Sequence, residues 1–180
     1  MIRCIKPISI LHRESAEKDS FIVGFINNGQ RPTDYIYYSL IQDILTGDLS
    51  SFLYRVLRDK MNLIYGIKLT FEMDKSYVLS MFEVSCQFEN SKKLVNMLVK
   101  LLRKFVAGKF ESQLLKRSKE RITIIDMNTG HDNTEFLNTF YSNQFIMSGK
   151  VVYTPDEYIN AVNKITKEQS LKDYFNLIRC

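Results

Sequence analysis

The chain has 180 residues, of which 45% are hydrophobic and 25% are charged, and its formal net charge is +5. This length and balance predict one globular domain with a sizeable core and exclude a disordered chain. No apolar run approaches the roughly 20 residues of a membrane-spanning helix. The first residues, MIRCIKPISILHRES, have neither the long apolar core nor the cleavage site of a signal peptide.

The positive charge is spread along the chain and is interleaved with acidic residues. The densest basic groups are Lys92 with Lys93, and Lys116 with Arg117 and Lys119, and both fall on segments expected to be helical. A solvated helix face explains these groups better than a nucleic-acid-binding stripe does. We therefore expect no nucleic-acid partner and no membrane partner.

The three cysteines, Cys4, Cys86 and Cys180, are odd in number and far apart, and they form no CxxC pair. This spacing supports neither a disulfide framework nor a zinc knuckle. An intracellular, reducing compartment is the simplest interpretation. We expect Cys86 to face the core.

Two strands are expected first. Residues 2–11 are mostly apolar and β-branched, and Pro7 indicates an edge position. Residues 21–26 form a short, almost continuous apolar run, which is typical of a buried strand. The polar segment NNGQRP ends this run.

A helix is expected next, because apolar residues recur at spacings of three and four. These residues are Tyr37, Leu40, Ile41, Ile44 and Leu45. Thr33 or Asp34 can cap the start of this helix, and Gly47 can end it in the left-handed conformation.

A second helix follows at once, with Ser50 or Ser51 as its cap. Its inner stripe consists of Leu53, Val56 and Leu57. Arg58 lies beside this stripe in the last turns of the helix.

Two strands are expected after residue 66. Apolar and polar residues alternate over 67–73 and again over 78–88, and the polar residues 74–76 separate the two runs. A period of two on both sides of a short turn predicts an antiparallel hairpin with one buried face.

The rest of the chain is expected to be helical. A strong amphipathic stripe runs from Leu94 to Phe105 and ends at Gly108. A helix over 111–127 follows, and residues 128–130 break it. The apolar face of another helix consists of Phe136, Leu137, Phe140, Tyr141 and Phe145.

Two capping boxes are expected to begin the last two helices. Thr154 pairs with Glu157, with Pro155 at the first helical position, and Thr166 pairs with Gln169. The order of elements predicts an α+β domain, in which helices pack on one face of an antiparallel or mixed sheet.

No residue pattern indicates a catalytic or metal site in this chain. His12 and His131 are far apart, and no HxxEH motif occurs. His131 and Glu135 could share a helix face, but a helix start with Asp132 near its cap explains the same residues better. A GxSxG elbow and a Gly-rich phosphate loop are also missing. We expect the chain itself to bind no metal or cofactor and to have no catalytic residues.

The stretch LRDKMNLIYG leaves two interpretations open. Arg58 offers five hydrogen-bond donors in a fixed fork, and Tyr65 offers an uncharged phenol. In one cleft, the two could hold a peptide carbonyl and stabilise an oxyanion. Alternatively, Arg58 pairs with Asp59 or Glu72 on the surface, and Tyr65 is half-buried packing against the sheet.

The run ILTGDLSSFLYRVLRDKMNLIYG, residues 44–66, resembles the C-terminal half of the pitrilysin/insulinase-type (M16) metallopeptidases. In that family a helix ends in a leucine–glycine–x–x–serine–serine turn. The next helix carries leucine–arginine–glutamate–lysine, then glycine–leucine–alanine–tyrosine before a strand. In this chain Asp59 stands in place of the usual glutamate. Asn62 stands in place of the glycine, and Ile64 stands in place of the alanine. The hairpin and later helices follow the family's order.

The resemblance implies an M16 peptidase-like (LuxS/MPP-like) α+β fold, with residues 1–180 as a single C-terminal domain of the kind that lacks zinc. In the family, the N-terminal half carries zinc on an HxxEH motif, and the other half closes over the substrate. The chain ends at FNLIRC, where the family runs on into another strand. We expect either a fragment without that final strand or a free-standing reduced form.

The resemblance also gives Arg58 and Tyr65 a role, which is to bind the substrate for a zinc site located elsewhere. It implies an extended peptide as substrate, bound in part by addition to a sheet edge. The implied partner is a zinc-bearing M16 domain, or a further copy in a homo-oligomer. The chain alone is expected to be inactive. The alternative is a structural or assembly protein that keeps the fold without peptidase function.

Overall fold

The computed structural model describes residues 19–28, 35–73, 77–123 and 132–169. In chain order the elements are β1 (Asp19–Asn28), α1 (Tyr35–Thr46), α2 (Phe52–Tyr54), the π-helical segment η1 (Arg55–Lys60), β2 (Gly66–Met73), β3 (Tyr77–Cys86), the 3₁₀ turn η2 (Phe88–Asn90), α3 (Ser91–Val106), α4 (Ser112–Arg121), α5 (Thr134–Ser148) and α6 (Pro155–Lys164). The α+β class predicted from the sequence is confirmed.

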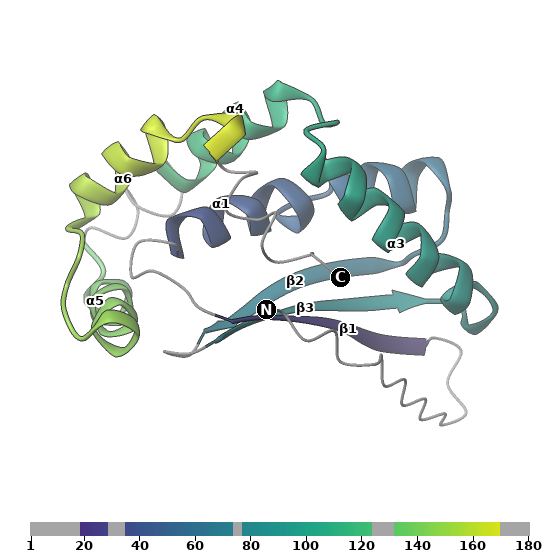
Figure 1. Ribbon diagram of the computed structural model, residues 1–180, viewed down its shortest axis with the longest axis horizontal. Helices are drawn as coiled ribbons and strands as arrows, with labels where there is room; N and C mark the ends of the chain where they lie inside the picture. The colour runs from purple at the N-terminus through teal and green to yellow at the C-terminus, as the bar shows by residue number, and fades with distance from the viewer. Residues whose placement is uncertain (1–18, 29–34, 74–76, 124–131, 170–180) are drawn as a thin grey trace.

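The three described strands form one antiparallel sheet in the order β1-β3-β2. The predicted hairpin is confirmed, since Met73 of β2 lies opposite Val78 of β3. Residues of β3 alternate between the buried and the open face, and Cys86 is fully buried as expected. Figure 1 shows α1, α3, α4 and α6 on one face of this sheet and α5 beyond one end of the strands.

The helices form two layers over the sheet. α1 and α3 lie directly on the sheet, and α4 and α6 lie farther from it (Figure 1). α1 contacts β2 on one side and α4 and α6 on the other. A helix enclosed on two sides needs apolar residues around more of its circumference than an amphipathic surface helix. Its buried side chains are Ile36, Tyr38, Leu40, Ile41, Ile44 and Leu45.

The helix ends follow the local rules that the sequence indicates. Thr154 and Glu157 form the predicted capping box at the start of α6, with Pro155 in its first turn. The second box also forms, because Thr166 N donates to Gln169 Oε1 (2.8 Å) and Gln169 N donates to Thr166 Oγ1 (3.2 Å). Gly108, just beyond α3, has a positive φ of 72°.

Two expectations need correction. Residues 21–26 were expected to form a buried strand, but Ile22 is 63% exposed, because it lies opposite the exposed Glu83 on the face of the sheet that the helices leave open. Phe145 was placed on an apolar face of α5 and is 60% exposed. The neighbouring Gln144 is buried instead, and its side chain bonds to the backbone of Val152 and Tyr153. The helix start expected near Asp132 is confirmed, because the adjacent Asn133 caps α5.

Some expectations fall outside the described residues. They are the strand over 2–11, the caps Thr33 and Asp34, the turn 74–76, the break 128–130 and both histidines. Within the described ranges, no helix combines the length and the apolar character that crossing a bilayer requires.

Candidate functional site

The segment that joins η1 to β2 carries both residues singled out in the sequence. Arg58 lies on η1 and Tyr65 directly precedes β2. The helix ends with wider hydrogen bonds than an α-helix has, since Met61 N donates to Val56 O (3.1 Å) and Leu63 N to Leu57 O (2.8 Å). Asn62 lies between them with φ +49°, a left-handed conformation that glycine and asparagine adopt most readily.

The start of β2 changes the phase of the strand. Gly66 lies opposite Ser85, and Tyr65 N also donates to Ser85 O (2.7 Å), so two residues face one, as in a β-bulge. Regular alternation from Ile67 would bury Tyr65. Instead Ile64 is 4% exposed and Tyr65 is 45% exposed. The extra residue therefore turns Tyr65 away from the core.

Buried neighbours fix the segment in place. Leu63 and Ile64 are each 4% exposed and belong to the core. Ile67 N donates to the hydroxyl of Tyr54 on α2 (3.3 Å). A segment held by two buried side chains and a hydroxyl presents its exposed residues in a defined geometry.

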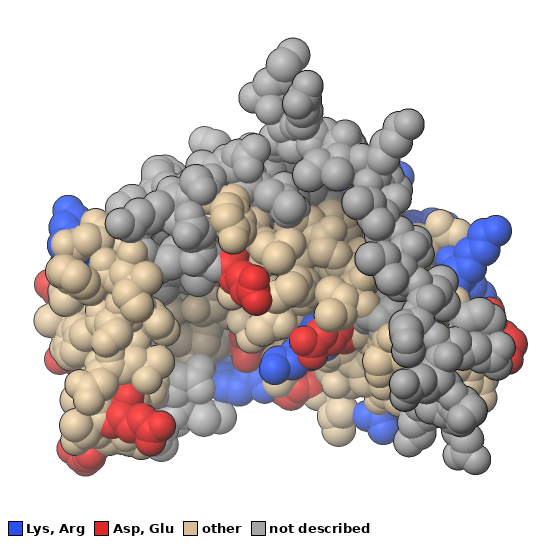
Figure 2. All heavy atoms as spheres, turned by 90° about the horizontal axis from the view of Figure 1, so that it is seen from below, with Lys and Arg blue, Asp and Glu red and all other residues tan. Residues whose placement is uncertain are grey.

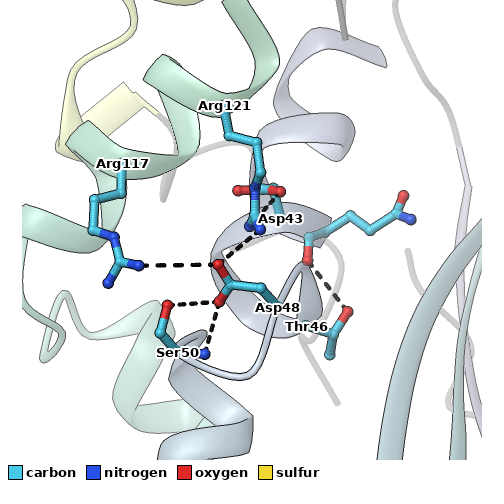
Figure 3. Close-up of polar contacts among 7 residues, drawn as sticks. Asp43, Thr46, Asp48, Ser50, Arg117 and Arg121 are labelled. Atoms are coloured by element: carbon cyan, nitrogen blue, oxygen red, sulfur yellow. Dashed lines mark hydrogen bonds and ion pairs between the residues drawn. The ribbon is translucent and has the colours of Figure 1, made fainter. Parts of the chain in front are cut away.

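Helices cover part of the outer edge of β2. Besides the bond from Ile67 to Tyr54, Leu69 N donates to Thr46 Oγ1 of α1 (3.0 Å). The Thr46 hydroxyl donates in turn to Gln42 O (3.2 Å) (Figure 3). These strand N–H groups are used by side chains, so an added strand could not pair with them. The expectation of peptide addition to a sheet edge does not hold at this part of β2.

Arg58 and Tyr65 are both exposed. The described residues contain no ion pair between Arg58 and either Asp59 or Glu72, so the surface pairing considered above is not observed. The structure places Arg58 and Tyr65 at the two ends of one short, anchored segment.

Tyr65 lies directly before β2, whose open face carries charged side chains. Lys68 of β2 and Glu83 of β3 lie directly opposite each other and are both exposed. Figure 2 looks onto this side of the molecule and shows acidic and basic side chains mixed among uncharged ones. The open face therefore carries charges of both signs among uncharged residues, including the exposed Ile22 opposite Glu83.

An ion-pair cluster fixes the turn between α1 and α2, a few residues before η1 (Figure 3). Arg121 of α4 pairs with Asp43 (2.7 Å) and with Asp48 (2.8 Å). Ser50 donates to Asp48 through its amide (2.8 Å) and its hydroxyl (2.6 Å). Burial alone raises the pKa of Asp48, but the Ser50 hydrogen bonds and the positive charge of Arg121 lower it overall.

Gly47 ends α1, as expected, but without the expected left-handed conformation. The reason for glycine here is space. A Cβ would lie 2.6 Å from the backbone oxygen of Asp43 and would also collide with the guanidinium of Arg121. The part of this requirement that comes from Arg121 of α4, far along the chain, is not revealed by the sequence around Gly47.

No metal centre is visible in the described part of the chain. Those ranges contain no group of three or more His, Cys, Asp or Glu side chains that could hold a metal ion. Zinc, which the resemblance assigns to another half, therefore does not fit the described residues of this domain.

The fold and this segment define an α+β domain that presents exposed residues from the junction of a helix and a strand. Residues 5–122 match the family model of the peptidase M16 inactive domain. The chain therefore belongs to the peptidase M16 inactive domain family. No curated protein matches it in sequence.

Solved structures support the same fold. The M16 inactive domain protein from Pseudomonas fluorescens is similar with a TM-score of 0.75 and 15% identity, over 90% of this chain and 38% of that one. A second similar structure is the inactive peptidase domain of a protein from Bordetella parapertussis assigned as a zinc protease. Its TM-score is 0.69 and its identity 14%, over 94% of this chain and 91% of that one. The periplasmic protease PqqL from Escherichia coli is similar with a TM-score of 0.69 and 13% identity, over 91% of this chain and 18% of that one.

The chain thus spans less than half of the Pseudomonas fluorescens protein and about the whole of the Bordetella parapertussis domain. At these identities the likeness concerns the fold.

Arg58 and Tyr65 could be named from the sequence. The bulge that exposes Tyr65 was missed, although two residues between the apolar Ile64 and Ile67 signal the change of phase.

Proposed function

We propose that this domain is the non-catalytic half of an M16-type zinc peptidase and that it binds an extended peptide substrate through Arg58 and Tyr65. A zinc-bearing M16 domain, on another chain or in another part of a longer protein, supplies the metal. The observation that carries the proposal is the anchored segment between η1 and β2. Its exposed Arg58 and Tyr65 flank the buried Leu63 and Ile64.

The two side chains suit a peptide carbonyl. An arginine donates from a rigid, permanently charged fork, and a tyrosine hydroxyl donates without carrying charge. Donors held in place before the reaction stabilise negative charge that develops on an oxygen, because they need no reorganisation. Arg58 and Tyr65 would hold the carbonyl of the bond to be cleaved, while the partner domain supplies the cleaving machinery.

Side chains rather than strand pairing would hold the peptide beside β2. Tyr54 and Thr46 already accept the N–H groups of Ile67 and Leu69 on the outer edge of that strand. This arrangement favours contacts that come from Tyr65 and the open face of the sheet. It also separates the proposal from simple β-strand addition.

The test is the activity of a reconstituted assembly that contains the zinc-bearing domain. Tyr65→Phe should lower kcat/KM by roughly a hundredfold or more, the scale of one lost oxyanion donor, with little effect on stability. Arg58→Lys should also lower it, because an ammonium group cannot reproduce the fork. Tyr77→Phe and Arg103→Lys are matched controls at exposed positions on β3 and α3, and should leave activity unchanged.

The opposite result would indicate the structural or assembly role. In that case Tyr65→Phe would leave the assembled activity intact but lower the melting temperature. The partner could then be a further copy of the chain, which sedimentation of the purified protein would reveal.

We also propose an intracellular location, which the widely spaced cysteines support. Cell fractionation tests this, because the similar PqqL is a periplasmic protein.

A further inference from the structure

A groove of about 370 Å³ lies beside η1, at the turn that joins α3 to α4. Its apolar lining comes from Phe52 and Val56 on one side and from Phe110 and Leu114 on the other. Phe110 and Leu114 are almost buried, at 8% and 6% exposed. Phe110 also stacks on Phe105 of the core, with ring centroids 4.6 Å apart. This floor is apolar and is tied to the core.

One wall of the groove is fixed by Lys167, which follows α6. Lys167 Nζ donates to Phe110 O (2.6 Å) and lies 4.2 Å from the centroid of the Phe110 ring. These contacts and the stacking on Phe105 together hold Phe110 in place. The groove is therefore formed before anything binds in it.

The rim of the groove is strongly basic. Its charged lining residues are Arg55, Lys60 and Lys109, against the single carboxylate of Glu111. Asp59 is close enough to act on the charge of Arg55, but it does not line the groove. On a chain whose acidic and basic residues are otherwise interleaved, this local excess of positive charge favours an acidic ligand.

The one carboxylate present shows how such a ligand would bind. Arg55 donates to both carboxylate oxygens of Glu111, at 2.8 and 3.2 Å. The hydrogen bond and charge of Arg55, and then the charge of Lys60, lower the pKa of Glu111. The side chains of Arg55 and Glu111 are 37% and 64% exposed, and pairs this exposed contribute little to stability. A carboxylate of a partner could therefore replace Glu111 at little cost.

We propose that this groove binds an acidic segment of a partner protein. An aromatic or aliphatic side chain of that segment would lie in the groove against Phe52 and Val56, and its carboxylates would lie on Arg55, Lys60 and Lys109. The groove is distinct from the substrate contacts proposed above. Arg58 lies on η1 between Arg55 and Lys60, so an occupant would also hold the helix that carries Arg58.

The probe is a fluorescein-labelled, end-blocked peptide with the sequence EDEFLDED, and fluorescence anisotropy with the full chain measures its binding. We expect binding that weakens with salt. The double variant Lys60→Glu/Lys109→Glu should weaken binding about tenfold or more, because reversing rim charges removes the complementarity. The control Lys92→Glu/Lys93→Glu makes the same change in net charge at the far end of α3, roughly 20 Å away along that helix, and should bind like the wild type.

A second peptide, EDESSDED, tests the apolar part of the proposal and should bind much more weakly than the first. Equal binding of the two peptides, or equal loss in the two double variants, would show only diffuse attraction and would overturn the proposal. So would a concentration-dependent dimer that Lys60→Glu/Lys109→Glu abolishes, because a second copy would then occupy the groove. Thermal unfolding of each variant verifies that these exposed substitutions leave the fold intact.

Discussion

Asn62 shows how one residue prepares the candidate site. Its φ of +49° lets the chain turn out of η1, after which Leu63 and Ile64 enter the core. Glycine would adopt this conformation freely, and asparagine does so better than most other residues. Asn62 therefore meets the backbone requirement of this turn.

Gly47 is a second residue with a specific requirement, and it leads to a prediction. Gly47→Ala should destabilise the protein by about 1–3 kcal/mol, because the new Cβ would collide with backbone and would displace the Arg121 pair. Urea denaturation measures this loss. Gly24→Ala is the matched control, since its Cβ would lie 3.5 Å from Leu79 in ordinary contact. Similar stability changes in both variants would contradict the packing argument.

At the scale of elements, β2 depends on hydroxyl groups from two helices. Thr46→Val and Tyr54→Phe should each cost about 1–3 kcal/mol, because each leaves a strand N–H without its partner. Hydrogen exchange should locate the effect, with the Leu69 amide exchanging faster in Thr46→Val. Thr139→Val on the exposed part of α5 is the control. Unchanged protection of Leu69 would show that another group satisfies this amide.

The turn between α1 and α2 should respond to acid. The pKa of Asp48 is lower in the folded state than its ordinary value of 3.8. Its carboxylate therefore stabilises the fold above the unfolded-state pKa, and this contribution is lost as the pH falls through the lower folded-state pKa. Asp48→Asn should reduce stability near neutral pH and flatten the decline in acid.

Urea titrations of the Asp48 variant across the acid range measure this effect. Asp132→Asn is an exposed control before α5 and should keep the wild-type profile. A parallel decline of the Asp48→Asn variant and the wild type would show that other carboxylates dominate acid unfolding.

The basic face of α4 is largely occupied by structural contacts. Arg117 and Arg121 face Asp48. Lys119 donates to the backbone oxygens of Asn163 (2.9 Å) and Ile165 at the end of α6, where a cation also complements the helix dipole. These contacts leave less of this basic group for phosphates. They favour the expectation that the chain binds no nucleic acid.

At the scale of the whole molecule, the described part of the domain contains a fold, an anchored segment and a groove, but no metal ligands. We predict that the purified chain binds no stoichiometric zinc and hydrolyses no peptide, because a catalytic zinc site needs about three protein ligands and an open position. Metal analysis and a peptidase assay with and without chelator measure this. Zinc at one equivalent together with chelator-sensitive activity would contradict it.

The sequence by itself determined the elements whose signals are local. The hydrophobic periodicity predicted the hairpin and the helices. The spacing of Thr154 from Glu157 and of Thr166 from Gln169 predicted the two capping boxes. The motif around Arg58 and Tyr65 also indicated the family, which the match over residues 5–122 confirmed. Such signals depend on neighbours within a few residues, so they survive without knowledge of the fold.

Only the tertiary structure decided the features that distant segments impose. At Gly47, the guanidinium of Arg121 from α4 adds a collision to the local one that a Cβ would have with Asp43. Ile22 is exposed because it lies opposite Glu83 of β3 on the open face of the sheet, and Tyr65 is exposed because Tyr65 and Gly66 share Ser85 of β3 as partner. Pairing and packing between residues far apart in sequence set these outcomes, and a local pattern carries no information about which distant group arrives.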